Sequence, residues 1–245
     1  MILLNGKKPI YKPSFFKRWE KTCFQSSEII IPIVLKILGN ISSVVDMGCG
    51  TGPWLSVFNS YGITDFTGID GDYVNEDALV ITKEHFKAYD LNKPLDLRRT
   101  FDLVVSLEVA EHLYPQNSET FVKTLIKHGS IILFSAAIPF QGGTHHFNEQ
   151  YQDYWSEIFK KNGYFAIDCI RPKIWDNKSV YWWYRQNIIL YIKKETIENN
   201  DTLKELYKET NSLLNRVHPQ NYLTRICQTI KFSPVLEFVK FFISR

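Results

Sequence analysis

The sequence predicts an α/β fold in which a mainly parallel sheet is covered on both faces by helices. Short apolar runs of strand type alternate with longer segments of helical periodicity up to about residue 192. Strands joined in this way form βαβ units, which build parallel sheets. We therefore expect a three-layer sandwich with a seven-stranded sheet whose last strand is antiparallel, followed by a helical C-terminal extension.

The individual elements follow from these runs. A helix is expected at 15–38, where Pro32 should break or kink it. Strands are expected at 43–47, 66–69, 85–89, 101–107, 130–135, 164–170 and 183–192, and helices at 54–61, 118–128 and 149–162. The chain should divide into one α/β domain at 1–195, with an N-terminal helical segment at 14–40, and a helical extension at 196–245, which could also pair two subunits in a homodimer.

The composition indicates one medium-sized globular domain. The chain has 245 residues, of which 44% are hydrophobic, and a net charge of +3 without a dense basic stretch, so no nucleic-acid partner is expected. The four cysteines are widely spaced and form no CxxC pair, which favours a reducing cytoplasm over a disulfide framework. Neither a signal peptide at 1–11 nor a run of ~20 apolar residues is found, so we expect a cytoplasmic protein without a transmembrane segment.

A glycine-rich turn follows the first predicted strand. The segment from Asp46 to Gly52 reads DMGCGTG, in which the glycines let the backbone turn sharply and approach a ligand. An acid two residues before the first glycine would repel a pyrophosphate but suits a ligand with a cationic amino-acid end. Asp70 ends the second strand, where a carboxylate can accept ribose hydroxyls, and Asp90 ends the third.

This arrangement resembles the first motif of class I S-adenosylmethionine (SAM)-dependent methyltransferases, whose fold is Rossmann-like. The resemblance implies SAM as cofactor and a cofactor-binding set that comprises Asp46, Gly48, Cys49, Gly50, Gly52, Asp70, Asp90, Leu91 and Glu108.

An acidic and histidine-bearing segment follows the fourth predicted strand. If a helical turn begins at Glu108, then Glu108, Glu111 and His112 lie on one face and could bind a divalent cation. His145 and His146 lie in the loop after the fifth strand, which opens on the same edge of the sheet. These side chains are also the candidates for acid–base catalysis, comprising His112, Glu111, His146 and His145.

The E-x-x-E-H pattern with a later histidine resembles two groups of metal-dependent O-methyltransferases, which act on small RNAs or in the ubiquinone pathway. That resemblance implies Glu108, Glu111, His112 and one loop histidine, preferably His146, as metal ligands. Mixed carboxylate and imidazole ligation suits Mg²⁺, Mn²⁺ or Fe²⁺ better than a closed zinc site. The same pattern also occurs in methyltransferases with no known metal. There Glu108 would contact cofactor or substrate, and His112 would act as a base or cap a helix.

The second half of the domain points to an acceptor class. The segment 134–150, with Tyr154-Trp155 and the run 183–187, resembles bacterial methyltransferases encoded in gene clusters for surface polysaccharides. This resemblance implies O-methylation of a capsule precursor, with a small or nucleotide-linked glycan, or a phosphoramidate decoration, as the acceptor. Arg185 and Asn187 could then bind the acceptor, Arg185 by pairing with a phosphate, or they could merely satisfy buried backbone groups. Members of that group carry one loop histidine, whereas this chain has two.

Two alternatives remain open at this stage. The protein could bind SAM without catalysis and support another methyltransferase, although the intact acidic and histidine cluster speaks against this. It could instead be an RNA 2′-O-methyltransferase, for which it lacks a strong basic patch.

Overall fold

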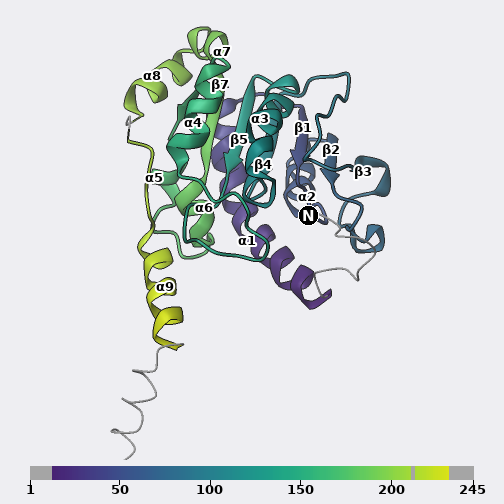
Figure 1. Cartoon of the computed structure of the whole chain (residues 1–245). Coiled ribbons are helices and arrows are strands. Elements are labelled where there is room, and N and C mark those ends of the chain that lie inside the picture. The colour runs from purple at the N-terminus through teal and green to yellow at the C-terminus, as the bar shows by residue number, and fades with distance from the viewer. Residues whose placement is uncertain (1–12, 211–212, 232–245) are drawn as a thin grey trace, which may run out of the picture.

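A seven-stranded sheet forms the centre of the computed structural model, which describes residues 13–210 and 213–231 (Figure 1). The strand order is β3-β2-β1-β4-β5-β7-β6, and β7 is antiparallel to both of its neighbours, while the remaining pairs are parallel. The strands are β1 (Ser43–Met47), β2 (Asp65–Asp70), β3 (Phe86–Ala88), β4 (Leu103–Leu107), β5 (Ile131–Ser135), β6 (Tyr164–Ile167) and β7 (Ile189–Lys193). The expected fold class is confirmed.

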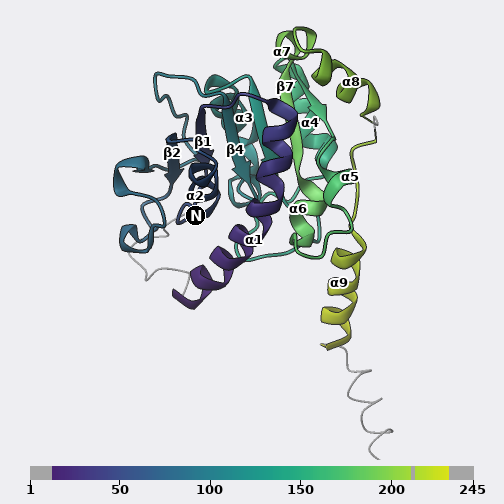
Figure 2. The same cartoon turned by 180° about the vertical axis from the view of Figure 1, so that it is seen from behind.

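Helices cover both faces of this sheet. In Figure 1 α3 (Ser118–Lys127) and α4 (Gln152–Lys161) lie in front of the sheet, and in Figure 2 α1 (Pro13–Leu38) lies in front of the opposite face. All five residues of β1 are buried, and successive side chains alternate between two cores. Val44 packs with residues of α1 and α2 (Pro53–Ser60), whereas Val45 packs with residues of α3 and α4. A strand covered on both faces has no polar side, which explains the continuous apolar runs.

The parallel strands bring their carboxyl ends to one edge of the sheet. Met47 pairs with Ile69 of β2, and Asp46 pairs with Val105 of β4. The chain segments that leave β1, β2 and β4 therefore emerge side by side, as in other open α/β sheets that bind ligands at this edge.

The N-terminal helix is found where the sequence predicts it, but it is not broken at Pro32. The predicted break at Pro32 is absent, because α1 runs without interruption through Pro32. Ile30, Ile31 and Val34 of this helix are fully buried in the core that α1 shares with α2. Burial of this apolar face supplies the stabilisation that offsets the hydrogen bond lost at proline.

The segment predicted as a single strand at 183–192 is divided in the structure. Its first part belongs to a short helix, α6 (Trp182–Asn187), and only β7 is extended. The aromatic run suits either conformation, and tertiary packing decides, since Tyr184 is buried edge-on against Trp54 of α2 at 5.3 Å between ring centroids. The strands predicted at 164–170 and 85–89 are likewise shorter, and 171–174 form α5 (Arg171–Ile174).

Three helices follow β7 within the described residues, α7 (Lys194–Glu198), α8 (Asp201–Glu209) and α9 (Pro219–Lys231). In the part of the chain that the structure describes, no helix is both long and apolar enough to cross a membrane. The predicted extension continues into residues 232–245, which lie outside the described residues.

Stability should depend on the aromatic cluster between α4 and the sheet. The fully buried Phe159 stacks on Tyr191 at 4.0 Å between centroids and lies edge-on to Phe134 at 5.4 Å. Phe159→Ala should lower the free energy of unfolding by about 3–5 kcal/mol, because it leaves a cavity in a packed core. Urea unfolding followed by circular dichroism measures this change. Phe140, which is 81% exposed, provides the matched control, and Phe140→Ala should change stability by less than about 0.5 kcal/mol. Equal losses in the two variants would contradict the prediction.

Candidate active site

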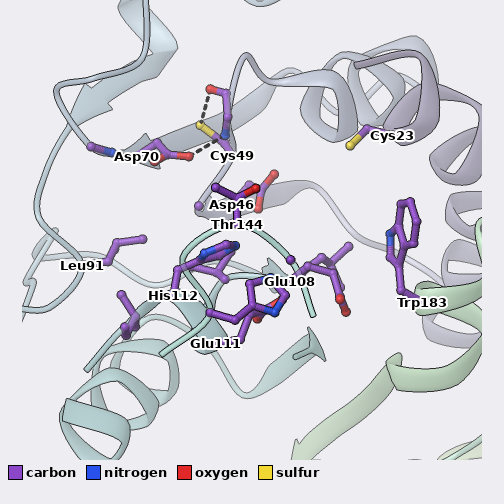
Figure 3. Close-up of a pocket in the computed structure, with 18 of the residues that line it drawn as sticks. Cys23, Asp46, Cys49, Asp70, Leu91, Glu108, Glu111, His112, Thr144 and Trp183 are labelled. Atoms are coloured by element: carbon purple, nitrogen blue, oxygen red, sulfur yellow. Dashed lines mark hydrogen bonds between the residues drawn. The ribbon is translucent and has the colours of Figure 1, made fainter. Parts of the chain in front are cut away.

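A cavity of about 550 Å³ opens at the carboxyl edge of the sheet. Its walls come from the segments after β1, β2, β3 and β4, from the loop after β5, and from helices α1, α6 and α9. In Figure 3 Asp46, Cys49 and Asp70 lie on one side of this cavity, and Glu108, Glu111 and His112 lie on another. The cavity thus brings together both groups of residues that the sequence singled out.

The glycine-rich turn forms one wall and leaves little room for side chains. Gly48 has a φ of 97°, and a Cβ atom there would lie 2.2 Å from Cγ2 of Val109. Only glycine fits this close crossing of the β1 and β4 segments. Gly48, Cys49 and Gly50 line the cavity, whereas Gly52 does not and instead precedes the first residue of α2.

Two carboxyl groups flank this turn. Asp46 is 3% exposed and lines the cavity, and burial together with the nearby Asp70 raises its pKa well above the ordinary value. Asp70 accepts hydrogen bonds from the backbone N–H groups of Gly50 and Gly71, each at 2.7 Å, and from the hydroxyl of Tyr73. Asp70 therefore ties the glycine turn to the end of β2.

Asp90 and Leu91, which were also predicted to bind the cofactor, reach the cavity as well. Asp90 and Leu91 follow β3 and line the cavity wall. The Asp90 carboxylate is about half exposed and accepts a hydrogen bond from the backbone of Asn92 at 3.0 Å, while Leu91 is buried. The apolar Leu91 and the peripheral acid make this end of the cavity suitable for a flat heterocycle.

Glu108 does not begin a helical turn, contrary to the sequence prediction. It has a left-handed φ of 56°, and the helical residues after it form only a short 3₁₀ turn at Ala110–His112. Glu108 and Glu111 therefore do not share a helix face. The strained backbone is held because the Glu108 N–H donates to both the carbonyl and the hydroxyl of Ser135, at 3.0 and 3.1 Å.

The Glu108 side chain is engaged by amide groups. Its carboxylate accepts hydrogen bonds from Gln141 at 2.7 Å and from Asn187 at 3.1 Å. Burial raises the pKa of Glu108, and the hydrogen bonds from Asn187 oppose that rise. Asn187 was predicted to bind the acceptor, but it does not line the cavity and instead holds Glu108 in place.

Glu111, His112 and His146 form a compact cluster. Each offers one potential metal-ligand atom, and these atoms lie within 4.8 Å of one another. Glu111 is fully buried, and within the described residues neither of its carboxylate oxygens accepts a hydrogen bond. Burial and the nearby Glu108 raise the pKa of Glu111 well above its ordinary value. A fully buried carboxyl group with so little hydrogen bonding is costly, which makes Glu111 a candidate ligand-binding residue.

The tautomers of the two imidazoles follow from their partners. Nδ1 of His112 lies 3.1 Å from the backbone oxygen of His145, and Nδ1 of His146 lies 2.9 Å from Oε1 of Glu149. Since both partners are acceptors, each Nδ1 carries a proton, and a neutral ring in this tautomer presents Nε2 as the acceptor. Withdrawal from bulk water and the neighbouring His146 lower the pKa of His112 to about 3, so this imidazole is neutral at physiological pH.

Two predicted side chains lie away from the cavity. The His145 side chain does not line it, and this residue contributes its backbone oxygen to His112 instead. Arg185 does not line it either, because its guanidinium donates to the backbone oxygen of Trp175 at 3.0 Å. This contact agrees with the alternative interpretation of the sequence, in which Arg185 donates a hydrogen bond to a buried backbone group.

The sequence prediction also missed residues that shape the cavity. Gln141 holds Glu108 from within the histidine-bearing loop, and Arg225 reaches the cavity from α9. The position of Gln141 in the distinctive segment 134–150 was a signal that could have identified it. Arg225 lies far along the chain in a polar helix, and nothing local distinguishes it from a solvated surface arginine.

Comparisons with known proteins agree with this geometry. Residues 24–187 match a family model described as a methyltransferase domain, whereas no protein of curated function matches the sequence significantly. Among solved structures, the fold resembles an amino pentose methyltransferase from Micromonospora echinaspora, with a TM-score of 0.54, 11% identity and coverage of 77% of this chain and 100% of that one.

Two further structures share the fold. Magnesium protoporphyrin IX methyltransferase from Synechocystis has a TM-score of 0.52 and 15% identity, over 77% of this chain and 90% of that one. DesVI from Streptomyces venezuelae has a TM-score of 0.53 and 14% identity, over 74% of this chain and 95% of that one. The amino pentose enzyme was solved with SAM and the Synechocystis enzyme with S-adenosylhomocysteine.

The family model spans the glycine turn, the acidic strand ends and the histidine cluster together, and this chain therefore belongs to the methyltransferase domain family.

Proposed function

We propose that the protein is a SAM-dependent methyltransferase that methylates a hydroxyl oxygen of a small acceptor. The observation that carries this proposal is one cavity with two chemically different halves. Asp46, Asp70 and the glycine turn lie in the first half, and Glu111, His112 and His146 lie in the second. The first half suits a cationic nucleoside cofactor, and the second suits the deprotonation of an acceptor.

The first half fits SAM in charge and in shape. Asp46 is a buried acid whose pKa is raised by burial and by the nearby Asp70, so a cationic partner would stabilise its charged form. The cationic amino group of SAM would supply that partner. Asp70 stands where a carboxylate can bind ribose hydroxyls, and the Tyr73 hydroxyl occupies one of its acceptor positions. Binding of the ribose would exchange this tyrosine contact for a contact with the ligand.

SAM supplies an electrophilic methyl group on a sulfonium, which an acceptor oxygen attacks in line to leave S-adenosylhomocysteine. The residues of the second half prepare that oxygen. His112 is neutral and keeps an Nε2 lone pair, so it can take the hydroxyl proton as a general base. A cavity that holds the cofactor and the acceptor together would convert the reaction into an effectively unimolecular step.

The second half also suits a divalent cation, and we include Mg²⁺ or Mn²⁺ in the proposal. Glu111, His112 and His146 would hold it, in agreement with the short distances between their potential ligand atoms and with the orientation of each Nδ1 toward an acceptor. In this metal-bound form the Nε2 lone pair of His112 would bind the cation instead of the hydroxyl proton, so the base role of His112 belongs to the metal-free alternative. Glu149 would orient His146 through Nδ1, a usual outer-shell arrangement at metal sites. Glu108 is left out of this set, because Gln141 and Asn187 already engage its oxygens. The cation would lower the pKa of the acceptor hydroxyl.

For the acceptor we keep the class that the sequence resemblance suggests. This is a sugar hydroxyl on a surface-polysaccharide precursor or on its phosphoramidate decoration, and it follows from the segment 134–150 and the run 183–187. Trp182 and Trp183 of α6 line the cavity and offer aromatic faces against which a sugar ring can pack. Figure 3 shows Trp183 at the side of the cavity where Cys23 and Glu108 lie.

Methyl transfer is tested directly with labelled SAM and a panel of nucleotide sugars and sugar phosphates. We expect a methylated product and an equal amount of S-adenosylhomocysteine, both quantified by mass spectrometry. His112→Ala should lower kcat by about 10²–10⁴-fold, because either the general base or, in the metal-bound alternative, a ligand of the cation is lost. His145→Ala, a neighbouring histidine outside the cavity, should change kcat little. SAM binding without turnover on any acceptor would instead favour a non-catalytic partner, and turnover on RNA alone would favour an RNA methyltransferase.

Cofactor binding should depend on the charge of Asp46. Asp46→Asn should weaken SAM binding by about 10–100-fold, because a charge-assisted hydrogen bond is lost. Since the pKa of Asp46 is raised, acidification should protonate it early, so wild-type affinity should fall as the pH decreases and the affinity of the variant should change less. Calorimetry over a pH series measures both effects. Asp96→Asn, at an exposed pair with Lys127 outside the cavity, is the control. Unaltered SAM affinity in Asp46→Asn would remove Asp46 from the cofactor site.

Metal binding can be measured without turnover. The chelator-treated protein should bind added Mn²⁺, which electron paramagnetic resonance measures. Glu111→Gln should weaken that binding by at least ~10-fold, because even changes to residues that only support the metal ligands cause losses of that size. Glu108→Gln is the matched control and should retain Mn²⁺, because its oxygens are already occupied by amide donors. Full methyltransferase activity after chelation, or equal Mn²⁺ loss in both variants, would refute this assignment.

A further inference from the structure

We propose that the Tyr73 hydroxyl occupies a ribose position on Asp70 in the free protein and that the cofactor must displace it. The inference rests on the proposed function and deepens it, because it makes Tyr73 a residue that sets cofactor affinity and eases the release of S-adenosylhomocysteine. It comes from the hydrogen bonds that reach Asp70 and from the way the chain holds Tyr73 beside this acid.

Asp70 has too few acceptor positions for the ribose while Tyr73 is bonded to it. A carboxylate offers about four lone-pair positions to hydrogen-bond donors. Within the described residues, Oδ2 accepts the N–H of Gly50 at 2.7 Å, and Oδ1 accepts the N–H of Gly71 at 2.7 Å and also the hydroxyl of Tyr73. A ribose that donates both of its hydroxyls needs two positions, so one of these donors must leave.

Tyr73 is the donor that can leave. The other two donors are backbone N–H groups, in the glycine turn and at the end of β2, and the course of the chain fixes them. The turn beneath Tyr73 is held as well, because Val74 is buried and its N–H donates to the Gly71 carbonyl at 3.1 Å. A rotation of the Tyr73 side chain is therefore enough to open the position on Asp70.

The Tyr73 ring lies at the cofactor wall of the cavity. Asp70, Gly71 and Tyr73 all line the cavity. A Cβ atom at Gly71 would lie 2.0 Å from Cε1 of Tyr73, so the ring packs directly on the glycine backbone. The side chain is half-buried and belongs to neither hydrophobic core. A ring at this place can pack against a bound nucleoside after its hydroxyl has left Asp70.

The exchange reduces the affinity of the protein for its cofactor. The buried Asp70 carboxylate is already hydrogen-bonded to Tyr73 before the cofactor arrives, so binding gains only the difference between the ribose contact and the tyrosine contact. After methyl transfer the exchange runs in reverse, since the Tyr73 hydroxyl returns to Asp70 as S-adenosylhomocysteine leaves. The product is therefore held less tightly than it would be without this hydroxyl.

Removal of the hydroxyl should strengthen cofactor binding, whereas loss of a supporting contact would weaken it. Tyr73→Phe keeps the ring and removes only the competing donor. Calorimetric titration with S-adenosylhomocysteine should show an affinity about 3–10-fold higher than in the wild type, because one hydrogen bond no longer has to be broken. Tyr89→Phe is the matched control and should not raise the affinity, since Tyr89 also lines the cavity but donates to the Pro94 carbonyl at 2.6 Å.

A crystal structure of the wild-type complex with S-adenosylhomocysteine provides the second readout, which does not depend on the folding of a variant. A higher affinity in Tyr73→Phe alone, with a ribose hydroxyl on Asp70 where Tyr73 had been, supports the inference. Unchanged or lower affinity in Tyr73→Phe, an equal gain in Tyr89→Phe, or a Tyr73 hydroxyl that stays on Asp70 in the complex overturns it. Failure of the wild type to bind S-adenosylhomocysteine overturns the proposed function itself, which distinguishes the two.

Discussion

The burial of carboxylates at the carboxyl edge of the sheet is the constraint on which the site depends. Glu108 can be buried there because Gln141 and Asn187 donate hydrogen bonds to it. Those amides are themselves held by Gln186, whose side chain bonds to both of them. A buried acid without such donors would be strongly destabilising. One polar network thereby joins the end of β4, the loop after β5, α6 and α9.

The acids of the cavity differ in how far the protein itself satisfies them. Asp70 and Glu108 accept several hydrogen bonds from the fold, and they act as structural ties for the glycine turn and for α6. Within the described residues, Glu111 has no hydrogen-bond donor for either oxygen, and the pKa of Asp46 is raised by burial. The groups left unsatisfied are the ones that a ligand must complete, which is a usual sign of a binding site. Asp46 and Glu111 therefore depend most on a ligand, whereas Asp70 combines its ties to the fold with the proposed ribose contact.

The position of α9 gives the C-terminal extension a place in the site. His218 and Asn221 anchor the helix to Gln186, and Trp175 accepts a hydrogen bond from His218 at 3.0 Å while the two rings lie 4.8 Å apart. Arg225 then reaches the cavity that the α/β sheet creates. In the proposed function, the edge of the sheet forms the part of the cavity that binds the cofactor. An appended helix such as α9 can change which acceptor is bound, because loops and extensions vary without disturbing the sheet.

The sequence alone determined the sheet, the glycine turn and the acids at the strand ends, because these follow from local patterns. Apolar runs, glycines and the acid before them are adjacent in the chain, and parallel topology brings the strand ends together. Only the tertiary structure decided the surroundings of Glu108, the conformation of 182–187 and the course of α1 through Pro32. These depend on contacts between distant segments, such as Glu108 with Asn187 and Arg225 with Gly142. No local pattern encodes such a pairing, since a side chain at either position could equally face solvent until the fold places its partner.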